Sequence, residues 1–97
     1  MLIESSYKDG DVVSLKLSSG EEIVARLDKE TPKEYTLKKP MVLIMQAEGL
    51  GLAPYMYSVK PTSKFNILVN SVSCIAKTET DIADQYTATT SGIQLEP

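Results

Sequence analysis

The chain has 97 residues, of which 42% are hydrophobic and 24% are charged, and its formal net charge is −3. This length and composition predict one globular domain, residues 1–97. The acidic balance excludes a large non-specific surface for nucleic acid or lipid head groups, because such surfaces take their affinity from lysine and arginine.

The first clear pattern in the chain is a β-hairpin. Apolar residues recur at every second position on both sides of a Ser-Ser-Gly turn, at Val13, Leu15, Leu17, Ile23, Ala25 and Leu27. This alternation around a glycine-containing turn is typical of a hairpin that buries one face. We therefore expect strands at about 12–17 and 22–28, followed by a charged loop at 29–34.

A third strand is expected at about 35–45, with an irregularity in the middle. Pro40 interrupts the alternation, and because proline is excluded from central ladders it predicts an edge, a bulge or a sharp bend. Residues 41–45 are apolar at every position. This half of the strand is therefore buried on both faces or meets another subunit. The glycine-rich residues 47–53 are expected to form a connection.

Two further strands are expected after this connection. The fourth starts near Tyr55 and continues through residues 65–69, after a break or bend at 61–64. A short fifth strand follows at about 72–76. Only Asn70 and Ser71 separate the two, which fits a tight turn.

The C-terminal part of the chain predicts a short helix at about 79–91. Residues 78–81 have the form of a capping box. Ile82, Ala83 and Tyr86 follow at helical spacing, and Gly92 is placed to end the helix.

The residues that usually carry catalysis or bind metals are scarce. The chain has no histidine and one cysteine, which removes the commonest general base and the usual zinc ligands. Asp28, Glu30 and Glu34 surround one loop, where a solvated turn is favoured over a divalent-ion site. Cys74 lies among apolar residues and is expected to be buried. The sequence therefore predicts a non-enzymatic protein without metal or cofactor.

The expected location is cytoplasmic. The N-terminal residues lack the basic and apolar regions of a signal peptide. No run reaches the roughly 18 apolar residues that a membrane-spanning helix needs. A single cysteine also fits a reducing compartment, and no contact with a membrane is expected.

The order of these elements resembles the Sm-like (LSm) family over about residues 10–77. The hairpin residues named above and Gly20 match the framework of the family's first motif. Ile67, Val69, Val72 and Ile75 match the apolar positions of the second motif. The resemblance implies a mainly β fold: a small, strongly bent, five-stranded barrel of SH3 type, with the C-terminal helix as an addition. It also implies a homo-oligomeric ring, in which strand four of one subunit pairs with strand five of the next.

The resemblance also implies where single-stranded RNA would bind. In the family, bases lie between the loop before strand three and an Arg-Gly turn between strands four and five. Here the best-aligned loop positions are Thr31 and Glu34, and Asn70 and Ser71 replace the Arg-Gly turn. Asn70 and Ser71, with Lys33 for charge and Tyr35 for stacking, are the candidate RNA contacts. The arginine is absent, and Glu34 would repel phosphate. Such departures are similar to those of the divergent Sm-like proteins that some phages encode.

Apolar and aromatic residues outside the hairpin are candidates for the contact between subunits, because interface cores are enriched in aromatic residues and methionine. A place in the core of the protomer is an equal alternative for them. The candidates are Val42, Ile44, Tyr55, Tyr57, Val72 and Ile75.

Three functions remain open from the sequence. The first is a homo-oligomeric ring that binds single-stranded RNA weakly. The second is a ring that acts as a scaffold or protein-interaction module for an unknown protein partner. The third is a monomeric SH3-type barrel that binds peptides. The acidic charge and the missing Arg-Gly turn favour the second over the first.

Overall fold

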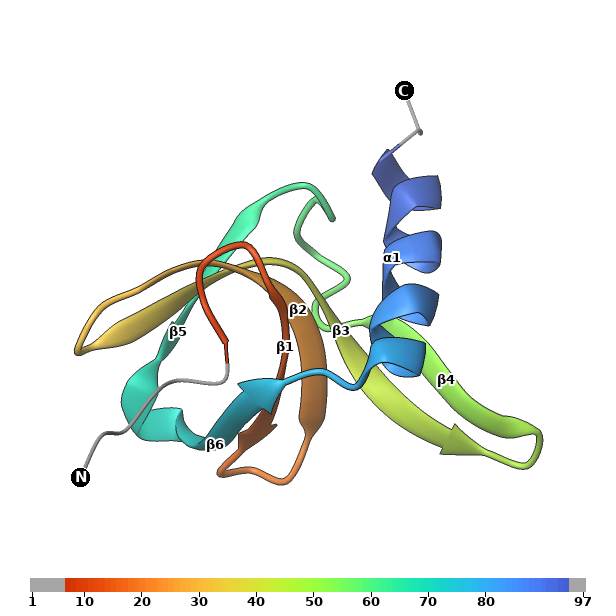
Figure 1. Ribbon diagram of the computed structural model, residues 1–97, viewed down its shortest axis with the longest axis horizontal. Coiled ribbons are helices and arrows are strands. Elements are labelled where there is room, and N and C mark those ends of the chain that lie inside the picture. The colour runs from red at the N-terminus through yellow and green to blue at the C-terminus, as the bar shows by residue number, and fades with distance from the viewer. Residues whose placement is uncertain (1–6, 95–97) are drawn as a thin grey trace.

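The computed structural model of the protein describes residues 7–94, and the side chains of residues 7–91 (Figure 1). The fold is mainly β, with an antiparallel sheet and one short C-terminal helix, as the sequence predicts. Its elements are β1 (Val12–Leu17), β2 (Glu22–Glu30), β3 (Glu34–Gln46), β4 (Gly49–Pro54), β5 (Lys64–Leu68), the 3₁₀ turn η1 (Val69–Ser71), β6 (Val72–Lys77) and α1 (Thr80–Gln94).

The long strand β3 organises the sheet. The strand order is β4-β3-β2-β1-β6, and β5 also pairs with β3. The first half of β3 pairs with β5, from Glu34↔Leu68 onward, and the second half pairs with β4 as far as Gln46↔Gly49. One strand therefore carries two others along the same edge, and the β3–β4 hairpin extends away from the rest of the sheet (Figure 1).

The prediction of a small five-stranded barrel is confirmed only as a mainly β fold with a C-terminal helix, because the sheet that the structure describes has six strands and does not close into a barrel. Among residues 7–94, β5 and β6 share no ladder. The reason is the turn η1, which is bound to other loops. The Val69 N–H donates to the Lys33 carbonyl oxygen at 2.9 Å, and the Ser18 N–H donates to the Ser71 carbonyl oxygen at 2.8 Å. These contacts continue the pairing of β5 with β3 and of β6 with β1, so the two strands leave the turn along different partners.

The main core lies on the inner face of the sheet. The alternating residues of the predicted hairpin point into it, and all are buried, as expected. Its fully or nearly fully buried members are Val13, Leu15, Leu17, Ile23, Ala25, Leu27, Tyr35 and Leu37.

A β-bulge at Lys39 and Pro40 interrupts the pairing of β2 with β3. Val24 pairs with Met41 and Arg26 pairs with Lys38, so both bulge residues lie opposite Ala25. Lys39 has a φ of +50°. A bulge accepts proline because its residues lie outside the regular ladder. The bulge predicted among the alternatives at Pro40 is therefore confirmed.

Because of the extra residue, the β3 side chains that face the main core are odd-numbered before the bulge and even-numbered after it. Before the bulge, Leu37 points into the main core; after it, Val42 packs against that core, while Met41 and Leu43 point to the opposite face. This is the expected effect of inserting one residue into a pattern of period two. It explains why residues 41–43 are apolar without interruption.

Helix α1 covers the apolar patch that the bulge creates on the outer face. Tyr86 is buried there against Val24 and Met41, with Leu43 and Ile82 packed around them. The helix is observed at Thr80–Gln94, so it continues past Gly92, which was expected to end it.

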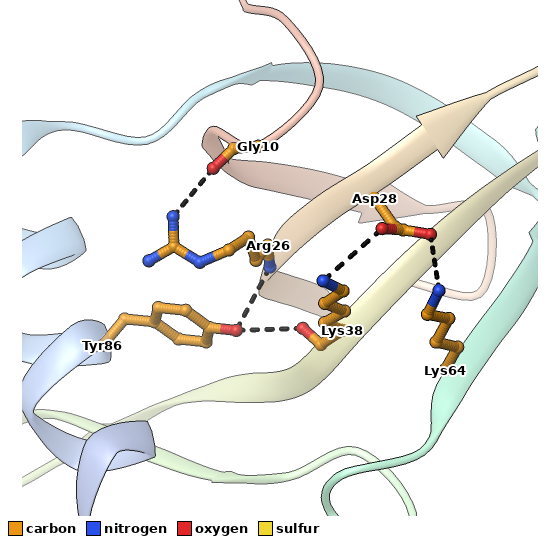
Figure 2. A network of polar contacts seen from close by, with 6 residues as sticks. All are labelled: Gly10, Arg26, Asp28, Lys38, Lys64 and Tyr86. Atoms are coloured by element: carbon orange, nitrogen blue, oxygen red, sulfur yellow. Dashed lines mark hydrogen bonds and ion pairs between the residues drawn. The ribbon is translucent and has the colours of Figure 1, made fainter. Parts of the chain in front are cut away.

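The hydroxyl of Tyr86 satisfies the backbone at the bulge. Its oxygen accepts a hydrogen bond from the Arg26 N–H at 3.1 Å. Its proton is shared between the carbonyl oxygen of Lys38 at 3.0 Å (Figure 2) and that of Lys39 at 2.9 Å. A bulge leaves backbone groups without ladder partners, and buried backbone groups need them. Tyr86 therefore joins α1 to the sheet by polar as well as apolar contacts.

Two predicted segments differ from the observed strands. Residues 49–54 form β4 instead of a connection, because pairing with β3 outweighs the weak strand preference of glycine. Residues 55–63 are irregular instead of forming the start of a strand. Pro54 precedes this segment and Pro61 lies within it. The Tyr55 N–H donates to the Pro40 carbonyl oxygen at the bulge, at 3.0 Å.

Cys74 is exposed, so the prediction that it is buried is wrong. Cys74 pairs with the exposed Lys16 and precedes the inward-facing Ile75, so regular alternation along β6 turns it outward. A second bulge follows on its other side. Lys16 pairs with Cys74 and Leu17 pairs with Val72, which leaves Ser73 as an extra residue in β6. Val72 and Ile75 pack against the main core, while Ser73 and Cys74 both face outward.

Replacing Tyr86 with phenylalanine tests the role of its hydroxyl. Tyr86→Phe keeps the ring but leaves buried backbone groups without a partner, so we expect the free energy of unfolding to fall by about 1–3 kcal/mol. Denaturant unfolding followed by circular dichroism measures this change. Tyr57→Phe is the matched control, because Tyr57 is 83% exposed. Equal stabilities of the two variants would contradict the proposed role.

Candidate functional site

The most connected polar cluster joins three strands and the helix (Figure 2). The carboxylate of Asp28 on β2 contacts the Nζ atoms of Lys38 at 3.5 Å and Lys64 at 3.2 Å. The hydrogen bond from Lys64, followed by the charges of both lysines, lowers the pKa of Asp28. Both pairs are solvent-accessible, so they contribute little to stability. They link the side chains of β2, β3 and β5 at the surface.

The three loop carboxylates do not converge. Asp28 is turned toward its two lysines, and Glu30 accepts a hydrogen bond from the Tyr7 hydroxyl at 3.2 Å. No group of three potential ligands among the described residues is arranged to hold a metal ion.

Three of the four residues predicted to contact RNA lie at one rim of the molecule. The backbone contact between Lys33 and Val69 brings Lys33 beside the turn η1, which contains Asn70 and Ser71. Lys33 and Asn70 are exposed, and the Ser71 hydroxyl donates to the Leu68 carbonyl oxygen at 2.8 Å. This rim is formed by two loops that are far apart in the sequence.

The fourth residue, Tyr35, belongs to the core. It is only 6% exposed, and burial, followed by the charge of Glu30, raises its pKa. Burial and the same carboxylate raise the pKa of the neighbouring Tyr7 to about 12. The tyrosine ring is therefore packed away from the rim, and negative charge lies near it.

The predicted subunit-contact residues divide into two groups. Val42, Tyr55, Val72 and Ile75 are partly buried against the main core. Ile44 and Tyr57 are exposed at the surface. The first group fits the alternative of a place in the protomer core, although each of its members keeps some accessible surface.

Strands β5 and β6 each have an unpaired edge, as does β4. Within residues 7–94, β5 pairs only with β3 and β6 pairs only with β1. Leu68, at the end of β5, is 61% exposed. Unpaired strand edges present free N–H and carbonyl groups that can accept another strand. The edges of β5 and β6 are the candidate functional surface of the molecule.

A second feature, a basic pocket beside Tyr86, is absent from the predictions made from the sequence. Arg26, Lys38 and Lys39 line it. The sequence offered one signal for this pocket. Arg26, the single arginine of the chain, lies in the strand before the one that contains Lys38, Lys39 and Pro40. The register across the bulge, which the sequence does not reveal, brings these residues together.

Comparison with known proteins adds no family assignment: no family model matches the chain, and no curated protein is significantly similar to it. The likeness to Sm-like proteins therefore rests on the strand pattern alone. Among residues 7–94, no helix has the length and apolar character needed to cross a bilayer.

The buried hydroxyl of Tyr86 predicts a loss of stability at alkaline pH. Burial raises the pKa of Tyr86 from 10.0 to about 12, despite the opposing effect of the nearby Arg26. The unfolded chain therefore loses this proton first. The stability that protonated Tyr86 supplies is complete below pH 10 and is lost as the pH rises toward 12.

Unfolding free energies measured from about pH 8 to pH 12 test this prediction. We expect the wild type to lose about 2 kcal/mol more than Tyr86→Phe over this range. Other alkaline groups, such as Tyr7, are common to both proteins and cancel in the difference. Parallel pH profiles would contradict the prediction.

Proposed function

We propose that the protein is a non-enzymatic, Sm-like subunit that assembles into a homo-oligomeric ring and acts as a scaffold. In this proposal β5 of one copy pairs with β6 of the next. The observation that carries it is the pair of open edges at the two ends of one bent sheet. The resemblance of the strand pattern to Sm-like proteins, described above, supports the same pairing.

The composition of β5 and β6 suits them to pairing. Neither strand contains glycine or proline, and each has a charged residue only at one end, Lys64 in β5 and Lys77 in β6. Edge strands that avoid pairing usually carry central charges, proline or glycine-rich bulges. The third open edge, β4, contains two glycines and ends at Pro54, which makes it a poorer pairing partner.

Assembly would also bury apolar surface that the single chain leaves accessible. Phe65 and Ile67 on β5, and Val72 and Ile75 on β6, are only partly buried. Burial of apolar area stabilises a complex by roughly 25 cal/mol per Å². A domain of this size buries a smaller fraction of its surface than a large domain does, so this additional burial would stabilise it appreciably.

The two surfaces differ, so the contact is heterologous. Repeating a heterologous contact produces a ring when the rotation closes. A monomeric, peptide-binding barrel is the competing function, and the mass in solution separates the two.

RNA binding is a second candidate function, favoured by the closeness of Lys33 to Asn70 and Ser71 at one rim. Two observations weigh against it. The ring of Tyr35 is buried, which removes a stacking surface for bases. Glu30 and Glu34 add negative charge to the same loop, which opposes phosphate. We therefore favour the scaffold.

A lysine on β5 should prevent assembly. Leu68→Lys places a charge on the proposed contact, where edge lysines oppose strand addition. We expect wild-type protein to elute from a sizing column as one species with a mass that is a defined multiple of the protomer, measured by light scattering, and Leu68→Lys as a monomer. Met45→Lys is the matched control, because Met45 is 78% exposed but lies on the β3–β4 hairpin. It should keep the wild-type mass.

A monomeric wild-type protein would contradict the ring and favour the peptide-binding barrel. An oligomer that is dispersed by Met45→Lys and retained by Leu68→Lys would contradict the assignment of the edges, because assembly would then depend on the hairpin.

A titration with a labelled uridine oligomer at low salt separates the scaffold from the RNA-binding ring. We expect no saturable binding. Because low salt strengthens phosphate contacts, weak RNA binding would be detected under these conditions. Saturable binding that is lost in Asn70→Ala and Lys33→Glu, but retained in the exposed-lysine control Lys60→Glu, would replace the scaffold with an RNA-binding ring.

A further inference from the structure

A pocket lies between α1 and the bulge in β3. Its volume is about 170 Å³, roughly ten times the space that one ordered water requires. Arg26 of β2, with Lys38 and Lys39 of the bulge region, lines one side. Tyr86, Thr87 and Ser91 of α1 are among the residues that line the other.

The pocket is positively charged although the chain is acidic overall. Three cationic residues line it and no carboxylate does, in a protein with a net charge of −3. Asp28, the ion-pair partner of Lys38, is shared with Lys64. Lys39 forms no ion pair within the part of the chain that the structure describes. The local charge is therefore in excess.

Hydrogen-bond donors are available around this charge. One N–H of the Arg26 guanidinium donates to the Gly10 carbonyl oxygen at 2.8 Å, which holds the group in place (Figure 2). The other guanidinium donors have no acceptor among the described residues. The Tyr86 hydroxyl is engaged by the bulge, whereas Thr87 and Ser91 present exposed hydroxyls at the rim.

We propose that this pocket binds the phosphate group of a small molecule. An oriented guanidinium fork matches the oxygens of phosphate, and a second cation with nearby hydroxyls supplies the remaining contacts. The small volume suits a single phosphate group and not a polymer. A ligand here would touch both α1 and the bulge, and so would stabilise the docked helix. This proposal does not depend on ring assembly.

Thermal unfolding and calorimetric titration with inorganic phosphate test the site. Sodium chloride at matched ionic strength separates specific binding from screening. We expect a saturable rise in Tm with phosphate only, because a ligand that binds the folded state stabilises it by mass action. Lys39→Asn removes one cation while asparagine tolerates the positive φ of +50° at this position. It should weaken the affinity for phosphate about tenfold.

Two further variants sharpen the result. Lys60→Asn makes the same charge change in the loop between β4 and β5, outside the pocket lining, and should bind phosphate like the wild type. Arg26→Lys keeps the charge but loses the fork, so it should bind phosphate more weakly while remaining folded by circular dichroism.

The source of the phosphate is separated by a parallel titration. Tighter binding of glycerol phosphate than of inorganic phosphate would identify a phosphate ester as the ligand, and the reverse order would identify the free ion. The proposal is overturned if phosphate and chloride raise the Tm equally. It is also overturned if Lys39→Asn and Lys60→Asn reduce the response to the same extent, since the lysines would then act only through the net charge of the protein.

Discussion

The hydroxyl of Tyr86 at the β3 bulge is the interaction on which the rest of the structure depends. Pro40 cannot take part in a regular ladder, so the chain must leave the pairing with β2 at this point. One hydroxyl then serves the backbone of Arg26, Lys38 and Lys39. The same contact fixes α1 to the outer face. Helix docking and the change of face in β3 are therefore two consequences of one arrangement.

The surfaces with proposed functions follow from this arrangement. Because β3 continues through the bulge, it carries β5 before the bulge and β4 after it, and the edges of β5 and β6 stay open at the two ends of the sheet. The bulge also places Lys39 beside Arg26 and α1. The proposed assembly at the edges and the proposed phosphate binding at the pocket would therefore use different parts of the fold.

Several elements could be predicted because they leave a local pattern in the sequence. The first hairpin, the bulge at Pro40 and the C-terminal helix were predicted because alternation, proline and helical spacing are visible within a few residues. The strand β4 was missed because glycine-rich residues form a strand only where a partner strand holds them. The exposure of Cys74 follows from its place opposite Lys16, which only the pairing of β6 with β1 reveals. The partners of Tyr86 lie 47 to 60 residues away along the chain, so no local pattern could assign them.

The central claim, that β5 and β6 are joined between copies, is tested most directly by hydrogen exchange of backbone amides at two protein concentrations. Strand addition protects the outward N–H groups of both edges. The account predicts slow exchange in β5 and β6 that speeds up on dilution, with no such change in β4. Exchange in β5 and β6 at the rate of exposed amides at every concentration would contradict it.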